Sequence, residues 1–256
     1  MRFKWYGTAT IMIKSGDSRL LVDPYTKKYS DDPLSPSDEM LSADAVLVTH
    51  PHVDHFVDTD AFAAGSPVYV SGKGIRLAEK NGLRTNDMRE IRAGDAFTVG
   101  SLCVRVFPAR HCRFDAATVL RVLFSPRTYR RLPDCIRLLS EASRFRIKRG
   151  ETLAFSVSDG EKTALVFGSA GMTDDAAYPQ GADLLVFPYQ GRRRMDKELI
   201  PFLERLRPKC VAIDHFDDAF PPVSDSVNTN RFASTVGKYL PTASALIPQP
   251  GVWYEI

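Results

Sequence analysis

The sequence lacks a long apolar run. Its 256 residues are 44% hydrophobic and 25% charged, but no stretch approaches the roughly 20 apolar residues that span a bilayer. The first six residues, Met1–Tyr6, have the pattern of a strand and not the apolar core of a secretory signal. We therefore exclude a membrane-embedded protein and expect a globular chain in the cytoplasm.

Cysteine is scarce and has no paired spacing. The four cysteines, Cys103, Cys112, Cys135 and Cys210, form neither a CxxC pair nor a closely spaced framework. This excludes a disulfide-stabilised fold and a cysteine zinc knuckle, so we expect buried thiols. Glycine-rich phosphate loops and serine-elbow motifs are absent as well, which argues against nucleotide binding and serine-hydrolase chemistry.

Histidine is scarce too, but it is concentrated. Only five histidines occur, and three of them lie within residues 50–55, which read HPHVDH. Imidazole nitrogens and carboxylate oxygens bind Zn²⁺ and similar cations in catalytic sites. His50 and His52 are two residues apart, so an extended turn after the apolar strand 45–48 would point both side chains the same way. Asp54 and His55 would face a second position, so one loop could serve two metals. The alternatives are a histidine-rich surface loop, or core histidines held by hydrogen bonds.

Apolar runs and alternating patterns predict two β-rich halves. The expected strands are residues 2–6, 9–14, 19–22, 45–48, 67–70, 102–107, 152–157, 163–167, 183–187 and 210–213. The expected helices are residues 73–81, a helix with Asp196 as its N-cap that ends before Pro208, and a third over 226–240. We therefore predict an α/β fold, a four-layer αββα sandwich, as a single domain over residues 1–256.

Residues 113–149 interrupt this scheme. The segment is long, rich in arginine and poor in strand signals, with Leu132, Ile136, Leu139 and Ala142 at helical spacing. Residues 121–150 carry nine lysines and arginines against two acidic residues, whereas the whole chain has a net charge of only +3. We interpret the segment 113–149 as an inserted basic helical cap.

The pattern HxHxDH after a strand resembles the signature of the metallo-β-lactamase superfamily. Residues 21–24 (LVDP) are similar to the family's early strand that ends in aspartate, and two later histidines match its remaining ones. The resemblance implies an αββα fold and a metal-dependent hydrolase. It also implies two ligand sets with Asp23 in a supporting position, namely His50, His52 and His111 for one metal and Asp54, His55 and His215 for the other. Zinc is the expected ion, with manganese or iron as alternatives.

The chain departs from the family pattern at one turn. Residues 168–171 (GSAG) follow the strand 163–167, and Ser169 stands where family members commonly have an aspartate that bridges two metals. Without that carboxylate the two-metal site would be one unit more positive. Either the second metal is weakly held or an anionic substrate compensates. We expect the site formed by the first histidine set to be the tighter one. The turn is similar to the lactonase-like and phospholipase-like branch of the superfamily.

Three neutral imidazoles with an open coordination position lower the pKa of a metal-bound water to about 7. The sequence therefore predicts a hydrolase that uses metal-bound hydroxide to cleave an ester, lactone or phosphodiester bond. Asp54 would orient the hydroxide or accept its proton, and it is the expected catalytic residue. The alternative is a catalytically weak or inactive metal- or ligand-binding protein of the same fold, which the loss of the bridging aspartate suggests.

Arginines indicate the kind of substrate. Arg192, Arg193 and Arg194 follow the strand 183–187 near the expected site, and guanidinium groups suit phosphate. With the basic cap they predict a small anionic substrate or a peripheral membrane contact, although a solvated charged face is an equal alternative. The near-neutral charge and the lack of interleaved aromatics argue against nucleic acid. The oligomeric state is left open.

Overall fold

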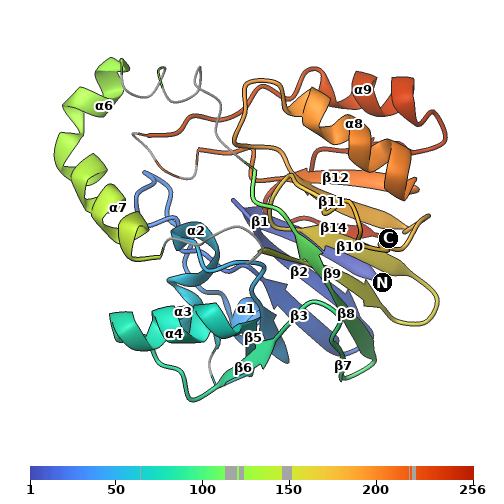
Figure 1. Cartoon of the computed structure of the whole chain (residues 1–256), viewed down its shortest axis with the longest axis horizontal. Coiled ribbons are helices and arrows are strands. Elements are labelled where there is room, and N and C mark those ends of the chain that lie inside the picture. Colours follow the sequence, from blue (N-terminus) through green and yellow to red (C-terminus); the bar gives the residue numbers. More distant parts are fainter. Residues whose placement is uncertain (64, 113–119, 121–123, 146–151, 219, 221–222) are drawn as a thin grey trace.

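The computed structural model describes residues 1–256 apart from 64, 113–119, 121–123, 146–151, 219 and 221–222 (Figure 1). One sheet contains β1 (Arg2–Gly7), β2 (Thr10–Ser15), β3 (Ser18–Val22), β4 (Ala45–Leu47), β5 (Val68–Ser71), β6 (Met88–Ile91) and β14 (Trp253–Glu255). The other contains β7 (Ala96–Val99), β8 (Leu102–Ala109), β9 (Thr152–Ser158), β10 (Thr163–Phe167), β11 (Leu184–Pro188), β12 (Cys210–Asp214) and β13 (Ser244–Leu246). Each sheet therefore has seven strands.

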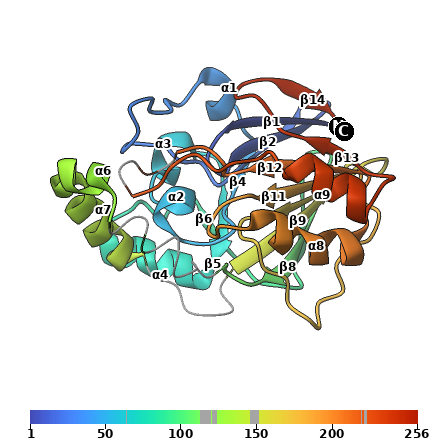
Figure 2. The same ribbon diagram turned by 90° about the horizontal axis from the view of Figure 1, so that it is seen from above.

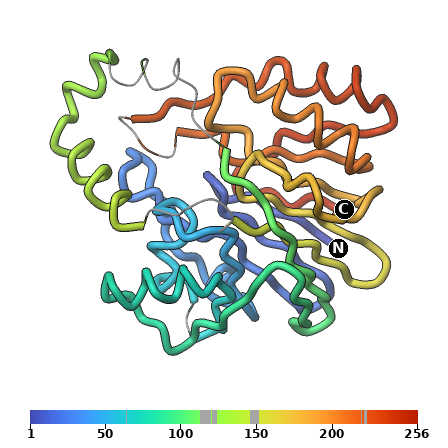
Figure 3. Tube along the Cα trace, viewed as in Figure 1, coloured from blue at the N-terminus to red at the C-terminus, as the bar shows by residue number. Residues whose placement is uncertain are grey.

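The two sheets have the same arrangement of strands. Their orders are β14-β1-β2-β3-β4-β5-β6 and β13-β12-β11-β10-β9-β8-β7, and each combines an antiparallel part with a parallel part. The chain closes on itself because β14 pairs with β1, which places the two termini side by side (Figure 3). The antiparallel meander predicted for the first three strands is confirmed.

Helices cover the outer faces of both sheets (Figures 1 and 2). The first sheet is covered by α1 (Asp38–Leu41), α2 (Val53–Phe56), α3 (Thr59–Ala63) and α4 (Gly72–Asn81), and the second by α8 (Met195–Leu206) and α9 (Phe232–Tyr239). Neighbouring side chains of one strand serve different layers: Leu20 and Val22 pack between the sheets, whereas Leu21 packs under the helices. Strands buried on both faces explain the continuous apolar runs, and the predicted four-layer αββα sandwich is confirmed.

Some expected elements have different bounds. The helix α8 begins at Met195 with Arg194 as its N-cap residue, so Asp196 is not the cap; its carboxylate pairs with the Arg194 guanidinium instead. The helix predicted over residues 226–240 is shorter in the structure, where only the residues of α9 are helical. The strands β6, β7, β13 and β14 have only three or four residues each, which is too short for an apolar pattern to stand out.

The predicted cap segment contains α6 (Pro126–Arg130) and α7 (Leu132–Arg144), which lie at one end of the molecule (Figures 1 and 2). The helical part of that prediction is thus confirmed for these residues, while 113–119, 121–123 and 146–149 lie outside the described residues. That the segment is an insertion in one domain stays a prediction. Among the helices of the described ranges, none combines the length and the apolarity that crossing a membrane requires.

One edge of the sandwich collects the ends of strands that run in the same direction. The strands β3 and β4 are parallel, and so are β10, β11 and β12, while β8 shares the direction of β10 because both are antiparallel to β9. The residues that follow these strands therefore gather at one edge, as the carboxyl ends of parallel strands do in other α/β folds. The predicted site residues are among them.

Candidate metal centre

All five histidines of the chain meet at this edge. His50 and His52 follow β4, and His55 lies in α2, whose N-cap residue is His52. His111 follows β8 and His215 follows β12. Their ligand atoms form two groups, each with atoms within 4.8 Å of one another: His50, His52 and His111 in the first, and Asp54, His55 and His215 in the second. The structure thus brings together every residue of both predicted ligand sets.

The first group, which we call the histidine trio, consists of three imidazole rings that lie close to one another. The ring centroids of His50 and His52 lie 4.7 Å apart, those of His52 and His111 4.5 Å, and those of His50 and His111 5.1 Å. Each pair of rings is close to perpendicular, with interplanar angles of 69–72°. The rings are therefore inclined to one another and not stacked, and their ligand nitrogens lie within 4.8 Å of one another.

Hydrogen bonds fix the tautomers of two rings in the trio. The Thr49 hydroxyl donates its single proton to Asp23 Oδ2 at 2.5 Å, so it can only accept from His50 Nδ1 at 3.0 Å. His111 Nδ1 lies 2.6 Å from the Cys112 carbonyl oxygen, which also can only accept. Both rings therefore carry a proton on Nδ1 and offer a bare Nε2. That Nε2 of His50 is buried and has no hydrogen-bond partner among the described residues.

The trio is also uncharged near neutral pH. Burial lowers the pKa of His50 well below its ordinary value, and nearby histidines lower it further. Burial and the neighbouring His111 lower the pKa of His52 to about 4, and burial lowers the pKa of His111 as well. Neutral imidazole is the form that binds metals, so the site fits a divalent cation in both geometry and charge.

The second group, which we call the carboxylate group, is already bonded within itself. His215 Nε2 lies 2.7 Å from Asp54 Oδ2, and His55 Nε2 lies 3.4 Å from the same oxygen. Burial disfavours a charged ring at His55, but Asp54 and Asp23 outweigh it and raise the pKa of His55 to about 10. Burial also disfavours a charged ring at His215, but the hydrogen bond to Asp54 outweighs this effect, so the pKa of His215 is raised as well. A positively charged ring therefore occupies this group next to the carboxylate.

Asp23 supports both groups, in the position that the resemblance implies for it. Its carboxylate accepts from the Thr49 backbone N–H at 2.7 Å, from the Thr49 hydroxyl, and from His55 Nδ1 at 2.7 Å. The side chain is almost fully buried and its backbone is left-handed, with φ of +46°. One carboxylate thus orients His55 directly and His50 through Thr49.

Ser169 bonds to the segment that carries His111. Its buried hydroxyl accepts a hydrogen bond from the Cys112 backbone N–H at 2.8 Å. A Cβ at Gly168 would overlap the Thr49 side chain, and one at Gly171 would overlap the Arg110 backbone. The two glycines therefore let the turn 168–171 pack against the segments that carry His50 and His111.

His215 is held by a strained corner that the sequence did not reveal. Its backbone N–H donates to the Thr8 carbonyl oxygen at 2.7 Å, and the Thr8 N–H donates to Asp217 Oδ1 at 2.9 Å. Lys27 Nζ lies 2.9 Å from Asp217 Oδ2. Thr8, Lys27 and His215 all have left-handed backbones, with φ of +49°, +53° and +58°. Such conformations cost about 1–2 kcal/mol each for residues with a Cβ, so the surrounding bonds must hold them in place.

Asp214 lies behind this corner. It is almost fully buried, and burial raises the pKa of its carboxyl to about 7. Its Oδ1 and the Nδ1 of His215 are buried without a hydrogen-bond partner among the described residues. The structure places both Asp214 and Asp217 beside His215.

The predicted arginines lie beside the centre and not within it. Arg192 Nη1 pairs with Glu198 at 3.0 Å, and Arg194 makes a two-pronged contact with Asp196 at 2.8 and 2.6 Å. These arginines and Arg193 line a cavity of about 1170 Å³ between residues 189–196 and 223–231. Gly191, which also lines this cavity, lies close to the centre, since a Cβ there would be 3.4 Å from Sγ of Cys112, the residue after His111.

Sequence reasoning missed several supporting residues. Thr8, Thr49 and Lys27 each hold a site segment, but isolated threonines and lysines have no pattern that marks them. Only Thr49 carried a local signal, because it stands between the apolar strand and His50.

Comparison with known proteins gives matches to a family model and to individual relatives. The model of the beta-lactamase superfamily domain matches residues 18–208. A UPF0173 protein of Pyrococcus abyssi is 34% identical over 113 residues, which are 43% of this chain and 50% of that protein. A UPF0173 metal-dependent hydrolase of Thermus thermophilus is 27% identical over 222 residues, which are 86% of this chain and 85% of the relative. The match with the Pyrococcus relative thus spans about half of that protein's length.

Solved structures share the fold. The metallo hydrolase Igni18 of Ignicoccus hospitalis superposes with a TM-score of 0.63 at 16% identity, covering 100% of this chain and 98% of that one. The metallo-beta-lactamase fold protein YhfI of Bacillus subtilis gives a TM-score of 0.61 at 14% identity, covering 100% and 99%. At these identities the likeness concerns the fold alone.

Proposed function

Because the chain belongs to the metallo-β-lactamase superfamily, we propose that its histidine centre binds zinc and hydrolyses an ester, lactone or phosphodiester of an anionic substrate. One observation carries this proposal: the buried, unpartnered Nε2 of His50 belongs to a trio of neutral imidazoles whose ligand atoms lie within 4.8 Å of one another. A divalent ion bound there supplies positive charge that polarises the bond to be cleaved and makes water more acidic.

The two groups would hold metal with different ease. Binding at the histidine trio breaks no hydrogen bond among the described residues, because Nδ1 of His50 and of His111 already donates to an oxygen. Binding at the carboxylate group must separate Asp54 from His215 and remove a proton from the charged pair. This supports the expectation that the trio is the tighter site and that the second site fills only at higher metal concentration.

Asp54 is the group of this chain that would act on the attacking water. It lies in α2 between His52 of the trio and His55 of its own group, and its carboxylate accepts from His215 and His55. Burial opposes ionisation, but His55 and His215 outweigh it and keep the pKa of Asp54 well below its ordinary value. Asp54 therefore stays an acceptor near neutral pH and orients water by a hydrogen bond.

The cavity beside Gly191 is where an anionic substrate would bind. Arg192, Arg193 and Arg194 all line this cavity, and we place the substrate contact on these guanidinium groups, with the exposed Arg193 as the one to test. Arg193→Gln is expected to raise KM with little change in kcat, because the contact is the same in the ground state and the transition state. We propose small anionic substrates, and not nucleic acids, for this arginine-lined cavity.

Metal content and turnover test the proposal together. Protein stripped by a chelator is reloaded with zinc, manganese or ferrous iron, and its metal is measured by mass spectrometry. Turnover is followed with p-nitrophenyl acetate, a γ-lactone and bis(p-nitrophenyl) phosphate. We expect one tightly held zinc per chain and activity that returns with it. His52→Ala should lose both, while Lys238→Ala on the exposed side of α9 should keep both. Turnover that survives chelation would contradict the proposal.

Ser169→Asp separates an enzyme from an inactive binding protein of the same fold. The added carboxylate restores the family's usual anion at the turn 168–171. New turnover together with a second bound metal would mean that the natural chain is a decayed enzyme. A fall from measurable activity would mean that the chain is specialised for one metal. The substitution removes the hydroxyl that accepts from the Cys112 N–H and so disturbs the segment that carries His111.

A reducing compartment suits the thiols of this chain. Cys103, Cys112, Cys135 and Cys210 are all thiols that form no disulfide in the described part of the chain. We therefore retain the cytoplasm as the proposed location, which fractionation of cells that express the tagged full-length chain would test.

A further inference from the structure

The cap helices bury a different stripe from the one that the sequence indicates. In α7 the buried side chains are Cys135 and Leu138, and Leu138 packs into the apolar cluster on the outer face of the first sheet. Leu132, Ile136 and Leu139 are spaced by four and three residues on a second stripe, and all three are exposed. Two apolar stripes on one helix mean that one of them has no partner within the described part of the chain.

The exposed stripe belongs to a part of the sequence in which exposed apolar side chains are concentrated. Six of the ten exposed large apolar side chains among the described residues lie between residues 120 and 139, and their exposed fractions are 48–74%. They are Leu120, Phe124, Tyr129, Leu132, Ile136 and Leu139. Single exposed apolar residues are ordinary, but a cluster of this size on one feature marks an interaction surface.

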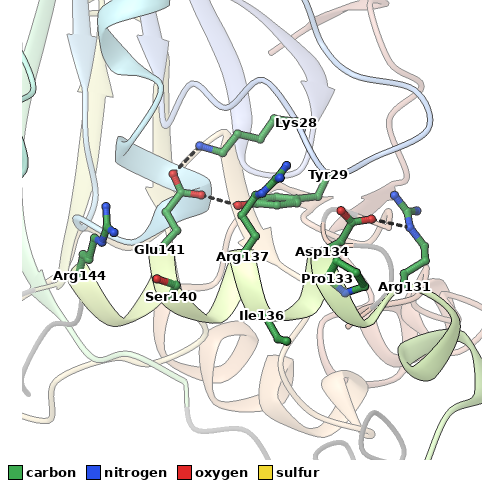
Figure 4. Close-up of a pocket in the computed structure, with 10 residues that line it drawn as sticks. All are labelled: Lys28, Tyr29, Arg131, Pro133, Asp134, Ile136, Arg137, Ser140, Glu141 and Arg144. Atoms are coloured by element: carbon green, nitrogen blue, oxygen red, sulfur yellow. Dashed lines mark hydrogen bonds and ion pairs between the residues drawn. The ribbon is translucent and has the colours of Figure 1, made fainter.

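Arginines border the apolar stripe. Arg137 and Arg144 directly follow Ile136 and Ser143, so each is displaced by about 100° around the helix axis from the stripe. Figure 4 shows Arg137 and Ile136 leaving α7 on different sides. Both arginines and Arg130 of α6 are exposed and form no ion pair with the described residues. The exposed surface of α7 therefore has an apolar part and a basic part, and Arg137 and Arg144 lie at the open cavity that Glu141 also lines.

The acidic side chains of α7 are occupied elsewhere. Glu141 accepts from Lys28 Nζ at 2.6 Å and from the Tyr29 hydroxyl at 2.8 Å, across a cavity of about 630 Å³ (Figure 4). Asp134 pairs with Arg131 at 3.0 Å. These contacts tie α7 to the segment after Asp23 and leave the exposed side of the helix with a net positive charge.

We propose that α6 and α7 dock on the surface of an anionic phospholipid bilayer, with Leu132, Ile136 and Leu139 at headgroup level and Arg137 and Arg144 against lipid phosphates. Helices with an apolar stripe bordered by basic residues lie in the plane of such interfaces. Both ribbon views place α6 and α7 at one end of the molecule, where they can meet a flat surface (Figures 1 and 2). A second copy fits less well, because a two-fold contact would bring the basic sides of both copies together.

Vesicle sedimentation tests this docking on the full chain. The probes are vesicles of equal parts phosphatidylcholine and phosphatidylglycerol, and vesicles of phosphatidylcholine alone. We expect the chain to sediment with the anionic vesicles only and to be released by added salt. Ile136→Glu with Leu139→Glu should weaken binding about tenfold or more, and Arg137→Gln with Arg144→Gln about fivefold for each arginine removed.

Matched variants complete the test. Ile247→Glu with Val252→Glu removes two apolar residues that are exposed elsewhere, and Lys197→Gln with Lys238→Gln removes two exposed charges on α8 and α9. Both controls should bind like the unchanged chain. Zinc content should stay the same in every variant, which keeps this proposal separate from the proposed hydrolase function.

Three results would overturn the docking proposal. The first is equal binding to both kinds of vesicle, and the second is equal loss in the control variants. The third is no binding to vesicles at all, which would leave the patch to another protein, or to a second copy if Ile136→Glu with Leu139→Glu lowers the molar mass measured by light scattering.

Discussion

The histidine trio and the carboxylate group lie side by side, yet they differ in what their side chains do without a metal. In the trio, Nδ1 of His50 and of His111 is bonded outward and Nε2 of His50 is left bare. In the carboxylate group, His215 and His55 turn their nitrogens toward Asp54. The first group is prepared for a cation, whereas the second neutralises its own charge.

The difference follows from where the carboxylates are. Asp54 is the only acidic member of either group, and Asp23 bonds directly to His55 but reaches His50 only through Thr49. Negative charge is thus concentrated on the side of His55 and His215. Since the turn 168–171 contributes a serine in place of a carboxylate, nothing in that turn offsets the asymmetry.

The largest effects are expected when one ring is removed from each group in turn. His111→Ala should lower zinc affinity and kcat/KM by more than about 100-fold, because losing a ligand must cost more than the 10–100-fold typical of a supporting partner. His215→Ala should leave the first zinc in place and reduce only the second. Isothermal titration with zinc and steady-state kinetics measure both variants, and equal losses in the two would show that the groups act as one site.

A smaller effect is expected from the corner that holds His215. Asp217→Asn removes the charge opposite Lys27 and weakens the bond to the Thr8 N–H, so the left-handed backbone at His215 is less firmly fixed. We expect the affinity for the second metal to fall about 10–100-fold while the first is unchanged.

Asp218→Asn is the matched control for this variant, since Asp218 is the next residue on the same loop and pairs with Arg127. It should leave both affinities unaltered. If Asp217→Asn lowers the melting temperature without changing the second affinity, Asp217 has a structural role and does not position His215.

The ligand loop was predictable because its pattern is local. The segment HPHVDH follows an apolar strand, and the strand directions then place His50, His52 and His55 at one edge. His111 and His215 are isolated in the sequence, and only their resemblance to a family pattern brought them into the predicted sets. Thr8 and Lys27 had neither kind of signal, because what matters is a backbone shape that forms only when distant segments meet.

The cap shows the opposite limit. Helical spacing predicts α7 correctly, but two apolar stripes are present and the sequence cannot tell which one faces the core. Leu138 is buried because it packs into the apolar cluster on the outer face of the first sheet, and Cys135 is buried with its Sγ 3.5 Å from the Thr128 carbonyl oxygen. The more strongly apolar stripe of Leu132, Ile136 and Leu139 is exposed. Periodicity fixes the type of element, and tertiary packing decides its orientation.

The pH dependence of stability in chelated protein gives the smallest effect and the sharpest contrast. His52 has an ordinary pKa of 6.5 that folding lowers to about 4. Between these values the unfolded chain binds more protons than the folded one, so the trio makes the fold lose stability as pH falls from 6.5 toward 4. The pKa of His55 is raised to about 10, so its contribution is complete below 6.5 and is lost as pH rises toward 10.

The melting temperature of metal-free protein should therefore fall on both sides of a maximum near pH 6 to 7, by several degrees on each side. His52→Gln should flatten the acid side and leave the alkaline side, whereas His55→Gln should flatten the alkaline side. Scanning calorimetry across the pH range measures both limbs. Saturating zinc should steepen the acid side in the unchanged chain, because metal and proton compete for the same imidazoles of the trio. If both variants flatten the same limb, the two groups do not have opposite charge states and the distinction between them is wrong.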